Sequence, residues 1–165
     1  MSENDESYEL LLLRRLEGQG PDHPNTMITV RNLIHGDARG LDRAVGAPTD
    51  APVEISDNTI RLDGDHVDKQ IDLIQTATAL QQNRVEEYGP DDPRTMVATS
   101  YVAYALAFAD QFTGQLEVAA VLARDAYEGL DDAAADDPSR LGPHDVRVAE
   151  LILRWIEDRL VQAEG

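Results

Sequence analysis

Cysteine is absent from the 165-residue chain, and lysine occurs once, at Lys69. Without cysteine there is no disulfide and no thiolate chemistry. Aromatic residues make up only 5% of the chain, and no apolar run approaches the roughly 20 residues that a helix needs to cross a bilayer. The first residues, MSENDESYE, are acidic, unlike the positively charged start of a secretory signal. We therefore expect a cytoplasmic protein that does not enter a membrane.

Positive charge is also scarce, because 14 lysines and arginines face 32 aspartates and glutamates, which gives a net charge of -18. Binding nucleic acid through its phosphates needs a positive footprint, so we expect no direct binding of nucleic acid. An acidic surface of this kind keeps a protein in solution or adapts it to salt. The alternative is a decoy whose carboxylates imitate nucleic-acid phosphates and occupy a basic partner protein.

The chain does contain a repeated phrase, GPDHPNTM at residues 20–27 and GPDDPRTM at residues 89–96, with a weaker third copy, LGPHDVRV, from Leu141. A phrase repeated in a chain of this length predicts repeat architecture. Its Gly-Pro pair stops a preceding helix, and its Asp-x-Pro step forms a turn. The proline then opens the next helix, because the first turn would leave its N–H unpaired anyway. Each copy therefore predicts a junction between two helices.

Apolar residues at helical spacing predict six helices between and beside these junctions. The expected ranges are 5–17, 24–35, 65–87, 93–109, 113–130 and 145–162. The helix expected at 93–109 is apolar on nearly every side, which is typical of a buried helix. The sequence thus predicts one all-α domain over residues 1–165, built as an antiparallel array of helix hairpins.

Two segments interrupt the helical pattern. Residues 46–65 hold two short alternating apolar stretches around a Ser-Asp-Asn turn. They predict either a small β-hairpin near 53–62 or an irregular insertion. Residues 131–140 are acidic and rich in alanine and include Pro138, and we expect an acidic loop there.

The junction phrase resembles the step between repeats in kinesin-light-chain-type tetratricopeptide repeats. Segment 95–112 is similar to the first helix of such a repeat at Thr95, Met96, Val102, Ala103, Leu106 and Phe112. It departs from the family at Ser100 and Tyr101, which stand in place of an Asn pair, and at Asp110, which replaces the turn glycine. The resemblance covers about half of the chain.

The spacing of the junctions fits a degenerate array. Gly20 and Gly89 are 69 residues apart, and Gly89 and Gly142 are 53 apart. Relative to a family unit of about 42 residues, the excess is about 27 and about 11 residues. The interrupting segments 46–65 and 131–140 are of about those sizes.

The resemblance also implies a concave face, lined by the first helix of each pair, on which a peptide or a partner helix lies. It places seven residues of this chain there: Arg31, Asn32, His35, Ser100, Tyr101, Tyr104 and Arg154. Asn32 matches the asparagine with which the family clamps a peptide. Burial in the core explains the two tyrosines as well.

Few residues suggest chemistry. Asp63, Asp65 and Asp68 gather carboxylates beside His66, but their spacing is not that of a calcium-binding loop, and a turn followed by a helix N-cap explains the same residues. No two histidines have the i, i+4 spacing of a helical zinc site, and we expect His23 to make a local hydrogen bond in the first junction. We expect no metal, no cofactor and no catalytic residue.

The sequence therefore predicts a non-catalytic interaction module that binds a peptide or a helix of a partner protein. A short array leaves an end helix exposed, so we also expect a homodimer, with Trp155 and Ile156 or Leu10 and Leu13 at the contact. Two alternatives stay open. One is the acidic mimic of nucleic acid, and the other is a small helical ligand-binding protein or enzyme with a pocket between helices.

Overall fold

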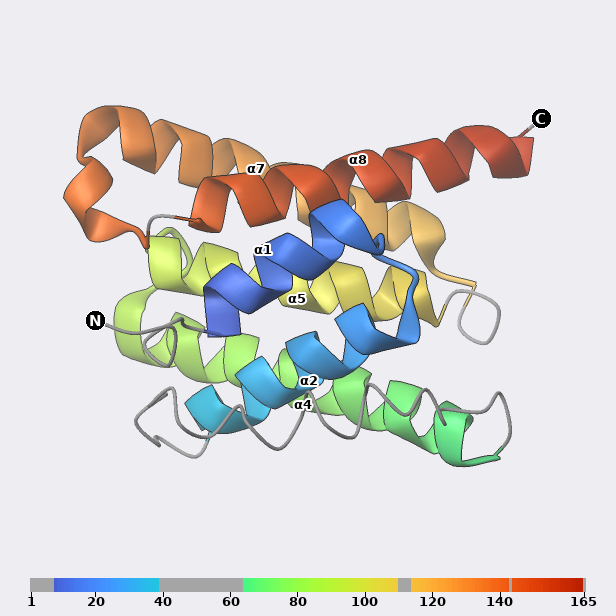
Figure 1. Ribbon diagram of the computed structural model, residues 1–165. Helices are drawn as coiled ribbons and strands as arrows, with labels where there is room; N and C mark the ends of the chain where they lie inside the picture. The colour runs from blue at the N-terminus through green and yellow to red at the C-terminus, as the bar shows by residue number, and fades with distance from the viewer. Residues whose placement is uncertain (1–7, 39–63, 110–113, 143, 165) are drawn as a thin grey trace.

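The computed structural model describes residues 8–38, 64–109, 114–142 and 144–164 (Figure 1). Within these ranges the chain forms six α-helices and one 3₁₀ helix and no strand, which confirms the predicted all-α class for this part. The elements are α1 (Tyr8–Gly18), α2 (Pro24–Ala38), α4 (Gly64–Tyr88), α5 (Pro93–Phe108), α7 (Leu116–Asp136), η3 (Pro138–Arg140) and α8 (Asp145–Glu164). The predicted β-hairpin at 53–62 lies outside the described residues, as does the insertion 46–65 except for its last two residues, which begin α4.

The acidic stretch 131–140 differs from the expected loop. Helix α7 continues through Asp136 and ends where Asp137 becomes extended, before the three residues of η3. The prediction was wrong for residues 131–136, because their three alanines are the strongest helix formers and their aspartates lie solvated on the helix surface. The stop comes from Pro138, which cannot continue the hydrogen-bond ladder of α7.

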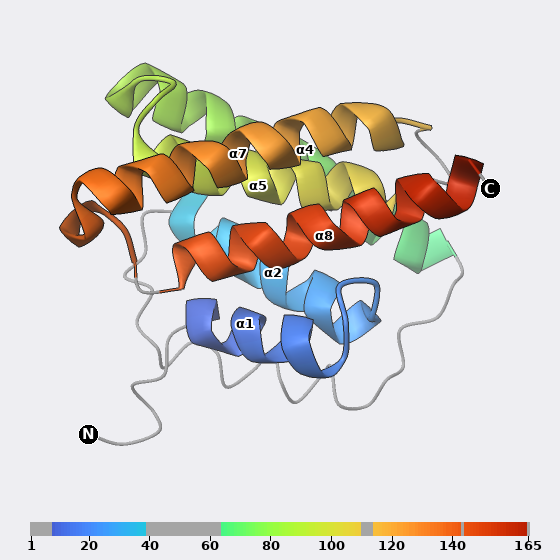
Figure 2. The same cartoon turned by 90° about the horizontal axis from the view of Figure 1, so that it is seen from above.

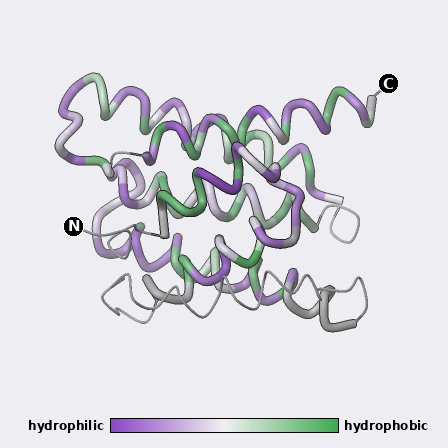
Figure 3. The backbone as a smooth tube through the Cα atoms, viewed as in Figure 1, coloured by the Kyte–Doolittle hydropathy of each residue, from purple (hydrophilic) through white to green (hydrophobic). Residues whose placement is uncertain are grey.

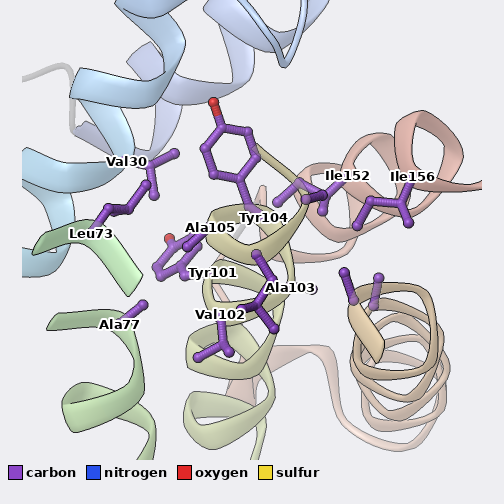
Figure 4. Packing of buried hydrophobic residues seen from close by; sticks show 14 of the residues in the cluster. Val30, Leu73, Ala77, Tyr101, Val102, Ala103, Tyr104, Ala105, Ile152 and Ile156 are labelled. Atoms are coloured by element: carbon purple, nitrogen blue, oxygen red, sulfur yellow. The ribbon is translucent and has the colours of Figure 1, made fainter. Parts of the chain in front are cut away.

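Helix α5 is the centre of the fold. Every residue from Ala98 to Ala107 is buried, and α4, α7 and α8 all pack against this helix. Figure 4 shows Tyr101 beside Leu73 and Ala77 of α4, with Ile152 of α8 on another side of α5. The expectation that a helix apolar on nearly every side is buried is confirmed.

The first and the last described helices meet. Helix α1 packs against α2 and also against α8. Figure 1 shows α1 in front of α5, and the view from above in Figure 2 shows it lying along the outer side of α2 and α8. In an open array each helix contacts only its neighbours along the chain. The contact between α1 and α8 closes this array across the face where a concave surface was expected.

Polar residues gather away from this centre. Hydrophilic colour prevails at the carboxyl end of α7, which extends beyond the ends of α4 and α5 (Figure 3). Of the helices described, none combines the length and the apolar character that a membrane span requires.

Candidate helix-binding surface

The first two junctions have the same local structure. Gly20 and Gly89 adopt φ angles of 98° and 95°, in the left-handed region that favours glycine. Each glycine carbonyl accepts a threonine hydroxyl, from Thr26 at 2.8 Å and from Thr95 at 2.7 Å. The threonine of the repeated phrase therefore ties the first turn of each new helix to the turn that precedes it.

The two copies differ at His23 and Asp92, but these side chains have the same role. The Nδ1 atom of His23 accepts the backbone N–H of Asn25 at 3.0 Å, and Oδ1 of Asp92 accepts that of Arg94 at 2.9 Å. Both acceptors satisfy an N–H group that the first turn of a helix leaves unpaired. The predicted local hydrogen bond of His23 is confirmed.

The third copy of the phrase keeps the turn and loses the hydroxyl bond. The N–H of Asp145 donates to the Gly142 carbonyl at 3.3 Å, and its carboxylate accepts the Gly142 N–H at 2.7 Å. Val148 replaces the threonine and is buried in the core. The three copies thus begin α2, α5 and α8, and apolar burial stands in for the hydroxyl bond at the last of them.

Three of the seven predicted partner-binding residues lie on α5 and are buried. Ser100 donates its hydroxyl to the carbonyl of Val97 at 2.7 Å. Tyr104 is fully buried and donates to the carbonyl of Pro21 at 2.5 Å, and Tyr101 is buried beside it. A partner cannot reach these side chains in the folded chain, so their placement on an accessible face is corrected to the core. The resemblance put them on an open face, whereas Tyr101 lies beside Leu73 and Ala77 of α4 (Figure 4).

The other four predicted residues lie on α2 and α8. Arg31 of α2 is half-buried and pairs with Asp72 of α4 at 3.0 Å, so it reaches toward α4. Arg154 of α8 is 65% exposed and pairs with Glu150 at 2.8 Å. Asn32 is partly buried, and His35 lies in α2 with a side chain outside the description. The seven predicted residues are therefore spread over α2, α5 and α8 rather than gathered in one groove.

Helix α1 packs its apolar side against α2 and α8. Leu12 is 0% exposed and Leu16 is 4% exposed. Both belong to the buried cluster that contains Val30 of α2 and Ile152 of α8. The i, i+4 spacing places the two leucines on one side of α1. We call the surface of α2 and α8 beneath this helix, which includes Val30 and Ile152, the α1 seat.

Polar contacts fix α1 on both sides of the seat. On the α2 side, Nη1 of Arg15 donates to the hydroxyl of Thr29 at 3.1 Å and to the carbonyl of Asn25 at 3.4 Å. Burial lowers the pKa of the Arg15 guanidinium. On the α8 side, Nε of Arg147 donates to Glu17 at 3.2 Å, between side chains that are both about half exposed. An exposed pair of this kind contributes about 0–1 kcal/mol, so the buried α2 side holds α1 more firmly.

Trp155 packs in an aromatic cluster beside the seat. Its ring lies 5.3 Å from that of Tyr104, and the Arg159 guanidinium lies 5.3 Å from the Trp155 ring while donating to the carbonyl of Ala107. Ile156 is fully buried, so its predicted place at a homodimer contact is corrected to internal packing. Trp155 is partly buried, and a homodimer contact through it stays a prediction.

Leu10 and Leu13, the second pair considered for a dimer, are partly buried on α1. The homodimer through them stays a prediction. The leucine run at 10–13 was the signal for a buried helix in the seat, but its pattern does not say which surface it covers.

The described residues contain no group of three or more His, Cys, Asp or Glu side chains that could hold a metal ion. Of the carboxylates weighed for such a site, Asp65 and Asp68 fall in the first turns of α4 with side chains outside the description, and Asp63 lies outside it altogether. Comparisons with protein-family models, curated proteins and solved structures found no match to the chain.

Proposed function

We propose that the protein is a non-catalytic interaction module of the cytoplasm that binds a helix or peptide of a partner protein at the surface around α2 and α8. The observation that supports this is the α1 seat. A surface that buries Leu12 and Leu16 from one amphipathic helix has the shape and apolar character with which grooves bind helices of other proteins.

The edge of the seat has the charge expected of a binding rim. In a chain of net charge -18, α8 presents Arg147 and Arg154 on either side of Glu150, with both arginines paired to it at 2.9 and 2.8 Å. Arginine is enriched at protein interfaces because it offers several donors and an apolar stem. A partner's carboxylate or carbonyl at this rim would take over donors that now serve Glu150.

The experiment is affinity capture of partners from a native lysate at low and high salt, with wild type and two charge-reversal variants. Arg154→Glu changes the rim of the seat. Arg124→Glu is the matched control, because Arg124 lies on α7, is 49% exposed and also has one glutamate partner, Glu157 at 2.7 Å. Partners that survive high salt and fall at least fivefold with Arg154→Glu, but not with Arg124→Glu, would support the proposal.

A second candidate function is the acidic mimic of nucleic acid. The observation that favours it is the outer side of α7, which exposes six carboxylates within the described residues: Glu117, Asp125, Glu128, Asp131, Asp132 and Asp136. Basic partners that wash off at high salt, and that are lost when Asp131 and Asp132 are changed to lysine, would support the mimic and contradict the helix-binding proposal. Capture of neither kind of partner would contradict both.

A further inference from the structure

We propose that α1 is an internal ligand of its seat, and that a partner helix carrying the same contact residues displaces it. The pattern is a leucine, an arginine three positions later and a second leucine one position after that, as in Leu12, Arg15 and Leu16. This rests on the proposed function and deepens it, since it names the chemistry of the partner and makes α1 the element that regulates access.

The contact residues of α1 form one recognition surface. Leu12, Arg15 and Leu16 share one side of the helix because positions three and four apart are neighbours on a helix surface. The leucines enter the buried cluster, and Arg15 reaches Thr29 and the Asn25 carbonyl at the start of α2. Any helix with this triplet can make the same contacts.

Helix α1 also depends on the seat for its own structure. It has 11 residues, and isolated helices shorter than about 12–15 residues are marginal in water. Its packing is to α2 and α8 rather than to the central helix pairs. Once α1 leaves the seat it therefore gains the freedom of an unfolded segment, which favours exchange with another helix.

The turn that follows α1 is fixed to the core independently of the seat. The turn after α1 stays attached to the core, because Pro21 accepts the buried Tyr104 hydroxyl at 2.5 Å and Gly20 accepts the Thr26 hydroxyl at 2.8 Å. On the other side, α1 is held to α8 by the exposed pair of Glu17 and Arg147. When α1 lifts from the seat, the bonds from Arg15 to Asn25 and Thr29 break. The bonds of Pro21 and Gly20 to Tyr104 and Thr26 do not involve α1 and can remain.

The test uses full-length protein and a labelled synthetic peptide of residues 8–19, with binding followed by fluorescence anisotropy. Glu17→Ala loosens the internal α1 by removing its contact to Arg147, and Arg15→Ala removes its contacts to α2. We expect Arg15→Ala to bind the peptide at least fivefold more tightly than wild type and Glu17→Ala up to about fivefold more tightly, because the internal competitor is weakened and the exposed Glu17 pair contributes less. Circular dichroism and melting confirm that the variants remain folded.

The peptide itself carries matched controls. Replacing its arginine equivalent to Arg15 by alanine should weaken binding about tenfold, which corresponds to about 1.4 kcal/mol. Replacing the leucines equivalent to Leu12 and Leu16 should abolish binding, and a scrambled peptide should not bind. Equal binding of all these peptides, or no binding to the loosened variants, would overturn the inference.

A locked protein separates this inference from the proposed function. Because the chain has no cysteine, Glu17→Cys with Arg147→Cys introduces a unique pair that a flexible bis-maleimide joins, with each single variant capped by a monofunctional maleimide as control. We expect locking to abolish peptide binding and partner capture.

If the locked protein still captures the partner in an Arg154-dependent way, the displacement of α1 is refuted while the interaction module stands. If peptide binding follows the expected pattern but capture does not depend on Arg154, the proposed function fails instead.

Discussion

At the scale of single residues, Tyr104 connects α5 to the turn between α1 and α2 and to α8. Its hydroxyl donates to the carbonyl of Pro21 and is directed toward the pale blue ribbons of α1 and α2 in Figure 4. Its ring lies 5.3 Å from Trp155 and 5.7 Å from Phe108. Burial, with a smaller contribution from the negative charge of Asp22, raises the pKa of the Tyr104 phenol well above its ordinary value. The folded protein therefore needs the neutral phenol.

Tyr104→Phe tests this residue. It leaves the Pro21 carbonyl without its donor, and we expect a loss of about 1–3 kcal/mol in the free energy of unfolding at neutral pH. Because the folded pKa is raised, the contribution of the Tyr104 phenol is fully present below the ordinary pKa of 10.0 and is lost as the pH rises through the folded value. Urea unfolding at pH 7, 9 and 10.5 should show the difference between wild type and variant shrinking only at the highest pH.

The control for the loss of one phenol is Tyr127→Phe, at a half-buried position of α7. Identical pH profiles for the two variants would contradict the role assigned to Tyr104.

At the scale of elements, the junctions determine where helices begin. Asp92 caps α5 through the Arg94 N–H and also accepts the Arg94 guanidinium at 3.0 and 3.1 Å. The hydrogen bond from the Arg94 side chain lowers the pKa of Asp92 below its ordinary value of 3.8, helped by the backbone hydrogen bond from Arg94 and against a small opposing effect of burial. The first junction achieves the same cap with Nδ1 of the His23 ring, which accepts the Asn25 N–H.

Exchange of the two caps tests their equivalence. Asp92→Ala and His23→Ala should each lower the free energy of unfolding by about 1 kcal/mol, while His23→Asp should retain it, because aspartate is among the strongest N-caps. The contribution of the lowered pKa of Asp92 is present above pH 3.8 and is lost as the pH falls through the folded value. Chemical denaturation measures each variant at neutral pH, and the comparison of wild type with Asp92→Ala is extended to acid.

Asp91→Ala, at the exposed neighbouring position, is the control for removing one carboxylate. A loss as large as that of Asp92→Ala would show that charge rather than capping is responsible.

The elements also show what the sequence could and could not predict. The starts of α5 at Pro93 and α8 at Asp145 were predicted, because turn and helix-start residues act locally. The end of α7 at Asp136 was missed, since acidic composition was taken as a loop signal although alanine favours the helix. The seat of α1 was missed for a different reason. The contact between Glu17 and Arg147 joins positions 130 apart, and no local pattern encodes it.

At the scale of the whole molecule, charge is the dominant feature. A net charge of -18 on 165 residues favours solubility but destabilises the compact state through self-repulsion. The ion pairs of the described surface are isolated pairs or small groups with exposed partners, and such pairs contribute little. Screening by salt therefore weakens the repulsion among the carboxylates more than it weakens the attraction within the ion pairs.

Added salt should accordingly stabilise the protein. We expect the melting temperature to rise by about 2–4 °C between low-salt buffer and NaCl at physiological ionic strength, since a gain of about 1 kcal/mol shifts a chain of this size by that amount. Most of the rise should occur below about 0.15 M, where the screening length is already about 8 Å. Differential scanning calorimetry over a salt series measures this, and a melting temperature that falls with salt would contradict the dominance of repulsion.

The contact between α1 and α8 also has a consequence for synthesis on the ribosome. Glu17 of α1 is made 130 positions before its partner Arg147 of α8. At about 5–20 residues per second, the ribosome needs roughly 7–26 s to supply the second half of the seat. Throughout that interval the leucine face of α1 has no complete place to dock. Nascent chains therefore present this helix to chaperones, or to a binding partner already nearby, before they can enclose it themselves.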